Sequence, residues 1–314
     1  MSMYVSGSLA FDRIMAFGGK FSDHILADKL HILNVSFFIN SLVEKRGGCA
    51  GNIAYTLALM GEKPLIVAAA GKNFTEYATF LQDLGLPLDG IRILPHEFTA
   101  ECTLITDQDN NQINGFYPAA MQFPCTYPFS ALDATTDWGI VSPGNFDDMQ
   151  RLPQLFREKG VRYIYDPGQQ IPALSGAALL DAITGSALLV TNDYELEMIC
   201  KTTSRTRAEL RALTGGIITT LGGQGSTIDN GASGTVGIAT PVTVADPTGA
   251  GDAYRSGLLK GLTHGLDITT CARLGATCAS FCVEHKGTQE HTFTCKTFAA
   301  RYTAAFGADL PVTW

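Results

Sequence analysis

The sequence predicts a three-layer α/β/α domain with a mostly parallel central sheet and a small β-rich lid. Three observations lead to this fold class. Strand-like and helix-like patterns alternate along most of the 314 residues, and residues 65–70 form a continuous apolar run typical of a strand buried on both faces. Two segments, residues 31–46 and 99–118, leave this alternation and look like antiparallel strands.

Local sequence patterns predict the individual helices and strands. Ile53, Leu57 and Met60 lie at helical spacing before Gly61, and Asn73 looks like the N-cap of the next helix. Strands are expected at residues 3–5, 65–70, 138–142, 161–165, 187–191 and 216–221, a helix at 147–159, and successive helices from residue 249 onward. This arrangement assigns residues 1–12, 47–98 and 119–314 to the core and residues 13–46 and 99–118 to the lid.

Composition excludes several classes of protein. A net charge of −8 and a pI near 5.2 argue against a nucleic-acid or membrane-surface partner. No apolar run approaches the roughly 18 residues of a membrane span, and no export signal is visible, so a cytoplasmic enzyme is expected. The eight cysteines contain no C-x-x-C pair and are interpreted as free thiols. Cys278 and Cys282, one helical turn apart, are better explained by a buried helix face than by a metal site.

Polar and glycine-rich segments follow several of the predicted strands. In open α/β sheets, ligands bind beyond the carboxyl ends of the strands. The informative segment is residues 246–252, because Gly249 and Gly251 let an anion approach a helix N-terminus, where free N–H groups and the helix dipole attract it. Asp252 in the first turn could accept a proton from an attacking hydroxyl. An ordinary turn with an N-terminal acid explains this motif alone equally well.

The other polar segments also leave alternatives open. Asn192 and Glu195 form either a helix cap or a Mg²⁺–phosphate motif, and the cap is favoured when the pair is taken alone. Residues 47–52 could be a tight helix entry or a loop that brings Asn52 to a polyhydroxylated ligand, and Asp12 could bind paired hydroxyls or lie on the surface. The sequence contains no P-loop, dinucleotide fingerprint, zinc-protease motif or hydrolase nucleophile elbow.

The chain resembles the ribokinase-like (PfkB) family of small-molecule kinases over nearly its whole length. The resemblance rests on five motifs in the family's order, namely the early Asp12, G-G-x-x-x-N, N-x-x-E, T-L-G-x-x-G and G-A-G-D. Further stretches resemble the bacterial adenosine kinases of that family, and these stretches are 7–12, 46–52, 116–118, 166–170, 191–195 and 287–290. The resemblance implies transfer of the ATP γ-phosphoryl group to the 5′-hydroxyl of adenosine. It also implies Mg²⁺ as cofactor, and a monovalent cation near Asp246 and Thr248.

The resemblance assigns a role to each matching position. Asp252 matches the catalytic base, and the anion hole is matched by Gly249, Ala250 and Gly251. The expected nucleoside-binding residues are Ser8, Asp12, Gly48, Asn52, Phe116, Gln169 and Gln170, with Phe116 stacking on the base. The expected ATP and Mg²⁺ residues are Asn192, Glu195, Thr220, Gly222 and Gly225. The lid is expected to close over bound substrate and exclude water.

One departure concerns the base site. Near Cys102 the adenosine kinases tend to place an aromatic ring, and its loss would loosen purine specificity. The alternatives are therefore a broader purine nucleoside kinase, a sugar kinase of the same family, and a nucleoside-binding protein without catalysis. A dinucleotide-dependent oxidoreductase lacks its phosphate fingerprint. A monomer and a homodimer through the lid are both compatible with the sequence.

Overall fold

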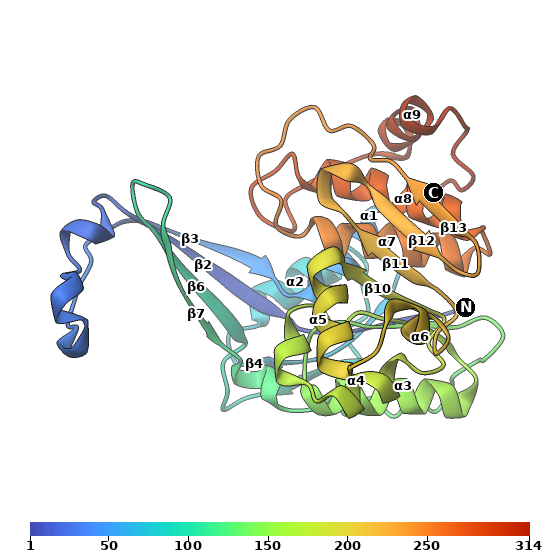
Figure 1. The fold of residues 1–314 in the computed structure, drawn as a ribbon, viewed down its shortest axis with the longest axis horizontal. Coiled ribbons are helices and arrows are strands. Elements are labelled where there is room, and N and C mark those ends of the chain that lie inside the picture. The colour runs from blue at the N-terminus through green and yellow to red at the C-terminus, as the bar shows by residue number, and fades with distance from the viewer.

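A nine-stranded sheet forms the centre of the molecule (Figure 1). The computed structural model describes residues 1–314, apart from the side chain of Ala27. The strand order is β13-β12-β11-β10-β9-β8-β1-β4-β5, with pairs parallel from β11 to β5 and antiparallel at the β11–β12–β13 edge. The strands span Met3–Ser6 (β1), Leu65–Gly71 (β4), Ile91–Leu94 (β5), Trp138–Val141 (β8), Arg162–Tyr165 (β9), Leu188–Asn192 (β10), Ile217–Thr220 (β11), Ser226–Asp229 (β12) and Ser233–Val236 (β13).

Helices cover both faces of this sheet, which confirms the predicted fold class. One face packs against α1 (Cys49–Leu59), α2 (Thr75–Asp83), α7 (Ala250–Thr263), α8 (Ile268–Cys282) and α9 (Cys295–Phe306). The other face packs against α3 (Phe146–Lys159), α4 (Gly176–Ile183), α5 (Asp193–Thr203) and α6 (Arg207–Arg211). Side chains along β1 alternate between the two faces of the sheet. Met3 and Val5 pack in the hydrophobic cluster on the α1 and α7 side, the first cluster, and Tyr4 packs in the second cluster on the α3 and α4 side.

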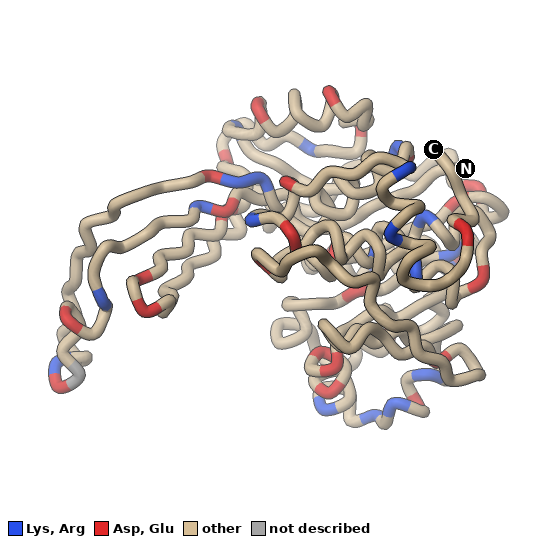
Figure 2. The backbone as a smooth tube through the Cα atoms, turned by 90° about the horizontal axis from the view of Figure 1, so that it is seen from above, with Lys and Arg blue, Asp and Glu red and all other residues tan. Residues whose placement is uncertain are grey.

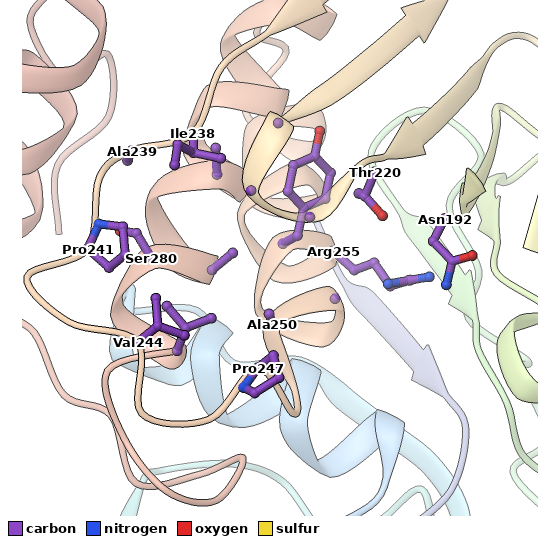
Figure 3. A pocket seen from close by; sticks show the side chains of 18 of the residues that line it. Asn192, Thr220, Ile238, Ala239, Pro241, Val244, Pro247, Ala250, Arg255 and Ser280 are labelled. Carbon is purple, nitrogen blue, oxygen red and sulfur yellow. The ribbon is translucent and has the colours of Figure 1, made fainter. Parts of the chain in front are cut away.

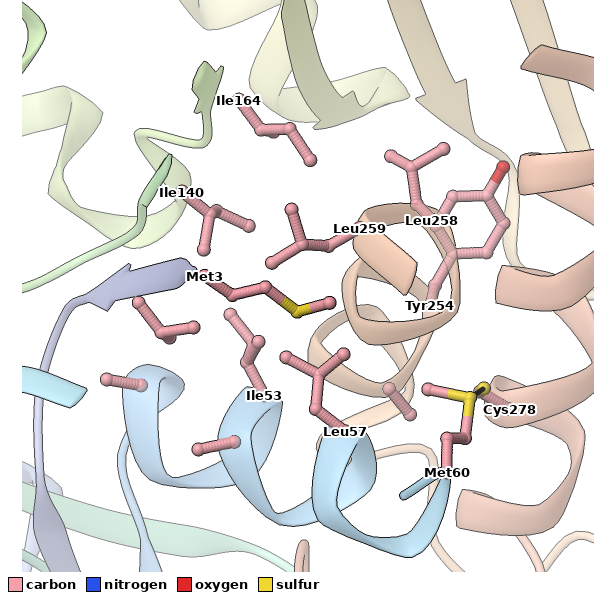
Figure 4. Packing of buried hydrophobic residues seen from close by; sticks show 14 of the residues in the cluster. Met3, Ile53, Leu57, Met60, Ile140, Ile164, Tyr254, Leu258, Leu259 and Cys278 are labelled. Atoms are coloured by element: carbon pink, nitrogen blue, oxygen red, sulfur yellow. Dashed lines mark hydrogen bonds between the residues drawn. The ribbon is translucent and has the colours of Figure 1, made fainter. Parts of the chain in front are cut away.

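The first cluster fixes α7 against the sheet and against its neighbouring helices. Leu258 and Leu259 of α7 meet Ile53 and Leu57 of α1 beneath the sheet residue Ile140 (Figure 4). Small residues bring α7 and α8 close together, because a Cβ at Gly257 would lie 2.5 Å from the backbone of Leu274. Cys278 and Cys282 are buried on α8, as the helix-face interpretation predicts.

A second sheet projects from the core (Figure 1). Its four strands have the order β3-β2-β6-β7 and span Ala10–Phe17 (β2), Ile39–Gly47 (β3), Ala100–Thr106 (β6) and Gln112–Tyr117 (β7). The sequence did not predict β2, and the β2–β6 pair is parallel although an antiparallel lid was expected. The start of segment 31–46 is also not a strand, because a 3-10 helix spans Ala27–Ile32. The exact core and lid boundaries stay a prediction.

Charge is unevenly distributed on the second sheet. Its charged residues gather at the end nearest the core and near the loop tips, whereas the strand middles are largely uncharged (Figure 2). Several apolar side chains there are exposed, among them Ile14, Leu42, Val43 and Ile113. Neither of the two states left open by the sequence, a monomer and a homodimer through the lid, is decided by this surface.

Three local features differ from the sequence-based expectations. Phe74 occupies the N-cap position of α2, and the Asn73 carboxamide oxygen instead accepts a hydrogen bond from the backbone N–H of Thr99. Asn73 therefore joins the start of β6 to the core. Strand β5 and the β12–β13 hairpin were also missed, because short edge strands carry little periodic signal.

Within the described residues, no helix is both long and apolar enough to cross a membrane.

Candidate active site

The first turn of α7 lies where two cavities meet. Gly249 is the N-cap and has a left-handed φ of 81°, which favours glycine. A side chain here would also collide with Thr288, since a Cβ would lie 2.8 Å from its methyl group. The backbone N–H groups of Gly251 and Asp252 make no hydrogen bond within the described part of the chain, so they are free to bind an anion.

The lid-side cavity has a volume of about 600 Å³ and lies between α7 and the second sheet. Its lining includes all seven predicted nucleoside-binding residues, namely Ser8, Asp12, Gly48, Asn52, Phe116, Gln169 and Gln170, and also Asp252. Gly48 has a φ of 88°, and a Cβ there would lie 2.5 Å from the carbonyl oxygen of Ser8. Glycine thus lets the entry to α1 pack directly on the loop after β1.

The strand register brings three lining residues onto one face of the second sheet. Asp12 on β2 pairs with Cys102 on β6, and Cys102 pairs in turn with Phe116 on β7. Directly opposed residues share a face, so this row presents a carboxylate, a thiol and an aromatic ring to the cavity. Phe116 is 52% exposed, so its side chain is available for contact with a ligand.

Asp252 is held by a chain of amide hydrogen bonds. Asn52 Nδ2 donates to Asp252 Oδ2 over 2.7 Å, and Gln289 Nε2 donates to Asn52 Oδ1 over 2.9 Å. Because Gln289 occupies the carbonyl end of the Asn52 amide, the NH₂ end must point at the carboxylate. Asn52 thus has a contact with Asp252 that the predicted ribose role did not include. Gln289 was not predicted as a site residue, although it lies in the quoted 287–290 segment.

Both carboxylates of the lid-side cavity are harder to ionise than usual. Burial raises the pKa of Asp252, while nearby Arg255 and the hydrogen bond from Asn52 oppose that rise. Burial, reinforced by the negative charges of Asp246 and Asp252, raises the pKa of Asp12 to about 6. Raised values of this kind suit a group that exchanges protons near neutral pH.

The hairpin-side cavity has a volume of about 460 Å³ and lies beside the β12–β13 hairpin. Its walls are largely apolar, with Ile238, Val244 and Pro241 on one side (Figure 3). Its polar end contains all five predicted ATP and Mg²⁺ residues, namely Asn192, Glu195, Thr220, Gly222 and Gly225. Ala250 lines this cavity, Gly249 lines the lid-side cavity, and Gly251 lines both, so the first turn of α7 separates them.

Asn192 and Glu195 form the capping box that the simpler interpretation predicted. Glu195 N–H donates to Asn192 Oδ1 over 2.7 Å, and Asn192 N–H donates to Glu195 Oε2 over 2.8 Å. The cap leaves Glu195 Oε1 unused at the cavity wall. No group of three or more potential metal-ligating side chains occurs among the described residues. The expected Mg²⁺ site at Asn192 and Glu195 stays a prediction, in which phosphate and water would supply most of the ligands.

A buried ion pair adjoins the junction of the cavities. Arg255 Nη2 donates to Asp166 Oδ1 over 2.6 Å, and the two residues are 7% and 1% exposed. Arg255 was not predicted as a site residue, since its partner is 89 positions away in the chain. The carboxylate oxygens of Asp246 accept hydrogen bonds from the N–H groups of Thr248 and Gly287, and the monovalent-cation site suggested there stays a prediction.

Known proteins resemble this chain in sequence and in fold. The family model of pfkB carbohydrate kinases matches residues 12–295. A nucleoside kinase of Methanothermobacter thermautotrophicus is 30% identical over 306 residues, which is 95% of this chain and 98% of that protein. The structure of the Burkholderia thailandensis nucleoside kinase in complex with inosine has a TM-score of 0.85 at 34% identity, with 98% of this chain and 99% of that chain covered.

A third comparison extends the likeness in fold to sugar kinases. The Arabidopsis thaliana ribokinase complexed with ribose and ATP has a TM-score of 0.79 at 18% identity, with 96% and 98% of the two chains covered. At this level of identity, the match shows a shared fold alone. Because the family model spans most of this sequence and the Methanothermobacter protein matches along nearly its full length, this chain belongs to the pfkB family of carbohydrate kinases, enzymes that transfer a phosphoryl group from ATP to an alcohol.

Proposed function

We propose that this protein is a nucleoside kinase that phosphorylates the 5′-hydroxyl of purine nucleosides, adenosine among them. The observation that carries the proposal is the position of Asp252, which lines the lid-side cavity on the turn that divides it from the hairpin-side cavity. A nucleoside in the first cavity and ATP in the second would meet at this turn. The names of the relatives support nucleosides as a class, and they favour the broader alternative over adenosine alone.

The reaction assigns each group a simple task. Asp252 takes the proton from the 5′-hydroxyl as its oxygen attacks the γ-phosphorus, and ADP leaves with the electrons of the broken P–O bond. The free N–H groups at the start of α7 stabilise the negative charge on the transferring group. Mg²⁺, when bound beside Glu195, would offset the charge of the ATP phosphates. Asp12 accepts hydrogen bonds from the ribose hydroxyls, and the second sheet closes over the nucleoside.

The residues around the base favour breadth among purines. Gln169 and Gln170 each carry a carboxamide, which can present either a donor or an acceptor to the edge of a base. They could therefore serve both a 6-amino and a 6-oxo purine. Phe116 supplies one stacking face, while Cys102 in the neighbouring position supplies only a thiol. A lone sugar needs neither the ring nor the paired amides.

We expect ADP release from ATP–Mg²⁺ to depend on a nucleoside acceptor, with adenosine and inosine both used and ribose poorly used. Replacement of Phe116 by Ala should raise the KM for nucleosides by roughly 5- to 160-fold, because one base-stacking contact is worth about 1–3 kcal/mol. A coupled ADP assay with adenosine, inosine, guanosine, cytidine and ribose measures both effects. Efficient turnover with ribose alone would contradict the proposal.

Asp252→Asn should lower kcat by about 10²- to 10⁴-fold, because the amide cannot accept the proton of the 5′-hydroxyl. The nucleoside affinity should change little, since the variant keeps the size of the side chain. Asp147→Asn is the matched control, because Asp147 is also an acid in the first turn of a helix but lies in neither cavity. Near-normal turnover of Asp252→Asn at saturating substrates would remove Asp252 as the base.

Nucleoside binding should weaken as the pH falls through about 6, because the pKa of Asp12 is raised to about 6 in the free protein. Ionised Asp12 accepts stronger hydrogen bonds from hydroxyls than the protonated form, so affinity is full above this pH and lost below it. Calorimetric titration with a nucleoside in the absence of ATP isolates this effect from catalysis. Asp12→Asn should bind weakly, with little pH dependence between pH 5 and 8. An unchanged wild-type Kd over that interval would exclude Asp12 from the site.

A further inference from the structure

Positive charge is scarce around the two cavities. Among the described lining residues, the only cationic side chain is that of Arg255, whereas three lining residues, Asp12, Glu195 and Asp252, are acids. A bound triphosphate adds further negative charge at the same place. Phosphoryl transfer relies on positive groups that neutralise the transferring phosphoryl, and an arginine is a common source of that charge. Among the described lining residues, Arg255 is therefore the side chain that can supply this positive charge.

Arg255 extends from α7 across the hairpin-side cavity toward Asn192 (Figure 3). Its guanidinium packs against the anion-binding turn, since a Cβ at Gly251 would lie only 2.7 Å from Nη1. Gly251 is the residue that lines both cavities. The charged end of Arg255 thus lies directly beside the backbone at which the two substrates would meet.

Asp166 at the end of β9 fixes the orientation of this guanidinium. It binds the Nη2 edge through Oδ1 over 2.6 Å, and its Oδ2 lies beside Nε. Nη1 makes no hydrogen bond to any described residue, so its two N–H groups remain available. A carboxylate on one edge of a guanidinium uses only two of its five N–H donors. Here Asp166 binds the Nε and Nη2 edge of the Arg255 guanidinium, and the Nη1 end is free.

We infer that Arg255 is a catalytic residue that donates from Nη1 to the transferring phosphoryl group, and that Asp166 is the residue that positions it. This inference rests on the proposed function. The bond from the 5′-oxygen to phosphorus forms while the bond from phosphorus to the β,γ-bridging oxygen breaks. Arg255 gains and loses no proton in this step. It stabilises the negative charge on the oxygens of the phosphoryl group together with the N–H groups of the α7 turn.

The contrasting explanation is a purely structural ion pair that joins β9 to α7. The two explanations differ in what removal of each partner does. If the pair only holds the fold together, Asp166→Asn and Arg255→Met break the same contact and should have similar effects on kcat. If Arg255 acts on phosphate, Asp166→Asn keeps the cation and should be much milder than Arg255→Met.

The decisive experiment compares kcat and nucleoside Kd for four variants. Arg255→Met should lower kcat by about 10²- to 10³-fold, as expected for loss of one preorganised donor to a transition-state anion. Its nucleoside Kd should stay within about threefold of wild type. The double variant Arg255→Met/Asp166→Asn leaves no unpaired buried carboxylate, and it should lose as much kcat as Arg255→Met. Asp166→Asn alone should lose about tenfold or less, because only the orientation of the guanidinium is relaxed.

Lys260→Met is the matched control on the same helix. Lys260 is also a buried cation, 1% exposed and paired with Glu62 over 2.7 Å, but it lines neither cavity. It should lose stability and keep kcat. Where Arg255→Met does not fold, as judged by nucleoside binding, the double variant and Arg255→Lys replace it, and Arg255→Lys should retain more kcat than the double variant.

Two results would overturn the inference. One is a kcat within threefold of wild type in the folded double variant, and the other is an equal loss of kcat in Asp166→Asn and Arg255→Met. The wild-type reaction separates this failure from failure of the proposed function. If wild type phosphorylates nucleosides and the double variant does so equally well, only the role of Arg255 is wrong.

Discussion

The position of the first turn of α7 is the constraint on which the site depends. Its free N–H groups and the carboxylate of Asp252 face the junction of the two cavities. The end of a helix keeps such a position only if the whole helix is held in place. Packing supplies that rigidity, because Leu258 and Leu259 are fully buried against α1 and the sheet, while Gly257 allows α8 to approach closely. The chemistry at one end of α7 therefore rests on the apolar contacts along its length.

Electrostatics sets how readily Asp252 in the same turn ionises. Asp252 is a buried acid whose charge is opposed by burial and favoured by Asn52 and Arg255. Gln289 orients Asn52, and Asp166 orients Arg255, so both groups that favour the charged form of Asp252 are themselves held by a second buried side chain. Such preorganisation avoids rearrangement during the reaction. Under the proposed function, the free backbone N–H groups of this turn would attract phosphate in a chain with few charged residues.

Sequence patterns could predict the central sheet and the residues that follow its strands, because parallel strands bring their carboxyl ends to one edge. Asn192 and Thr220 lie side by side at the ends of β10 and β11, whereas Asp252 reaches the site at the start of α7, after a loop that follows β13. The second sheet was harder to predict from sequence. Strand β2 has apolar residues on both faces, and its parallel pairing with β6 depends on contacts distant in sequence. Gln289 and Arg255 were missed for the same reason, since their partners Asn52 and Asp166 are 237 and 89 positions away. For Asn192 and Glu195 a cap and a metal-associated role do not conflict, because the cap uses only one oxygen of Glu195.

The most direct measurement is a crystal structure with a purine nucleoside and a non-hydrolysable ATP analogue bound together. The account predicts the nucleoside 5′-oxygen within hydrogen-bonding distance of an Asp252 carboxylate oxygen, and the γ-phosphate against the N–H groups of the α7 turn, between the two cavities. A nucleoside whose 5′-oxygen points away from Asp252, or a triphosphate bound elsewhere than the hairpin-side cavity, would contradict it.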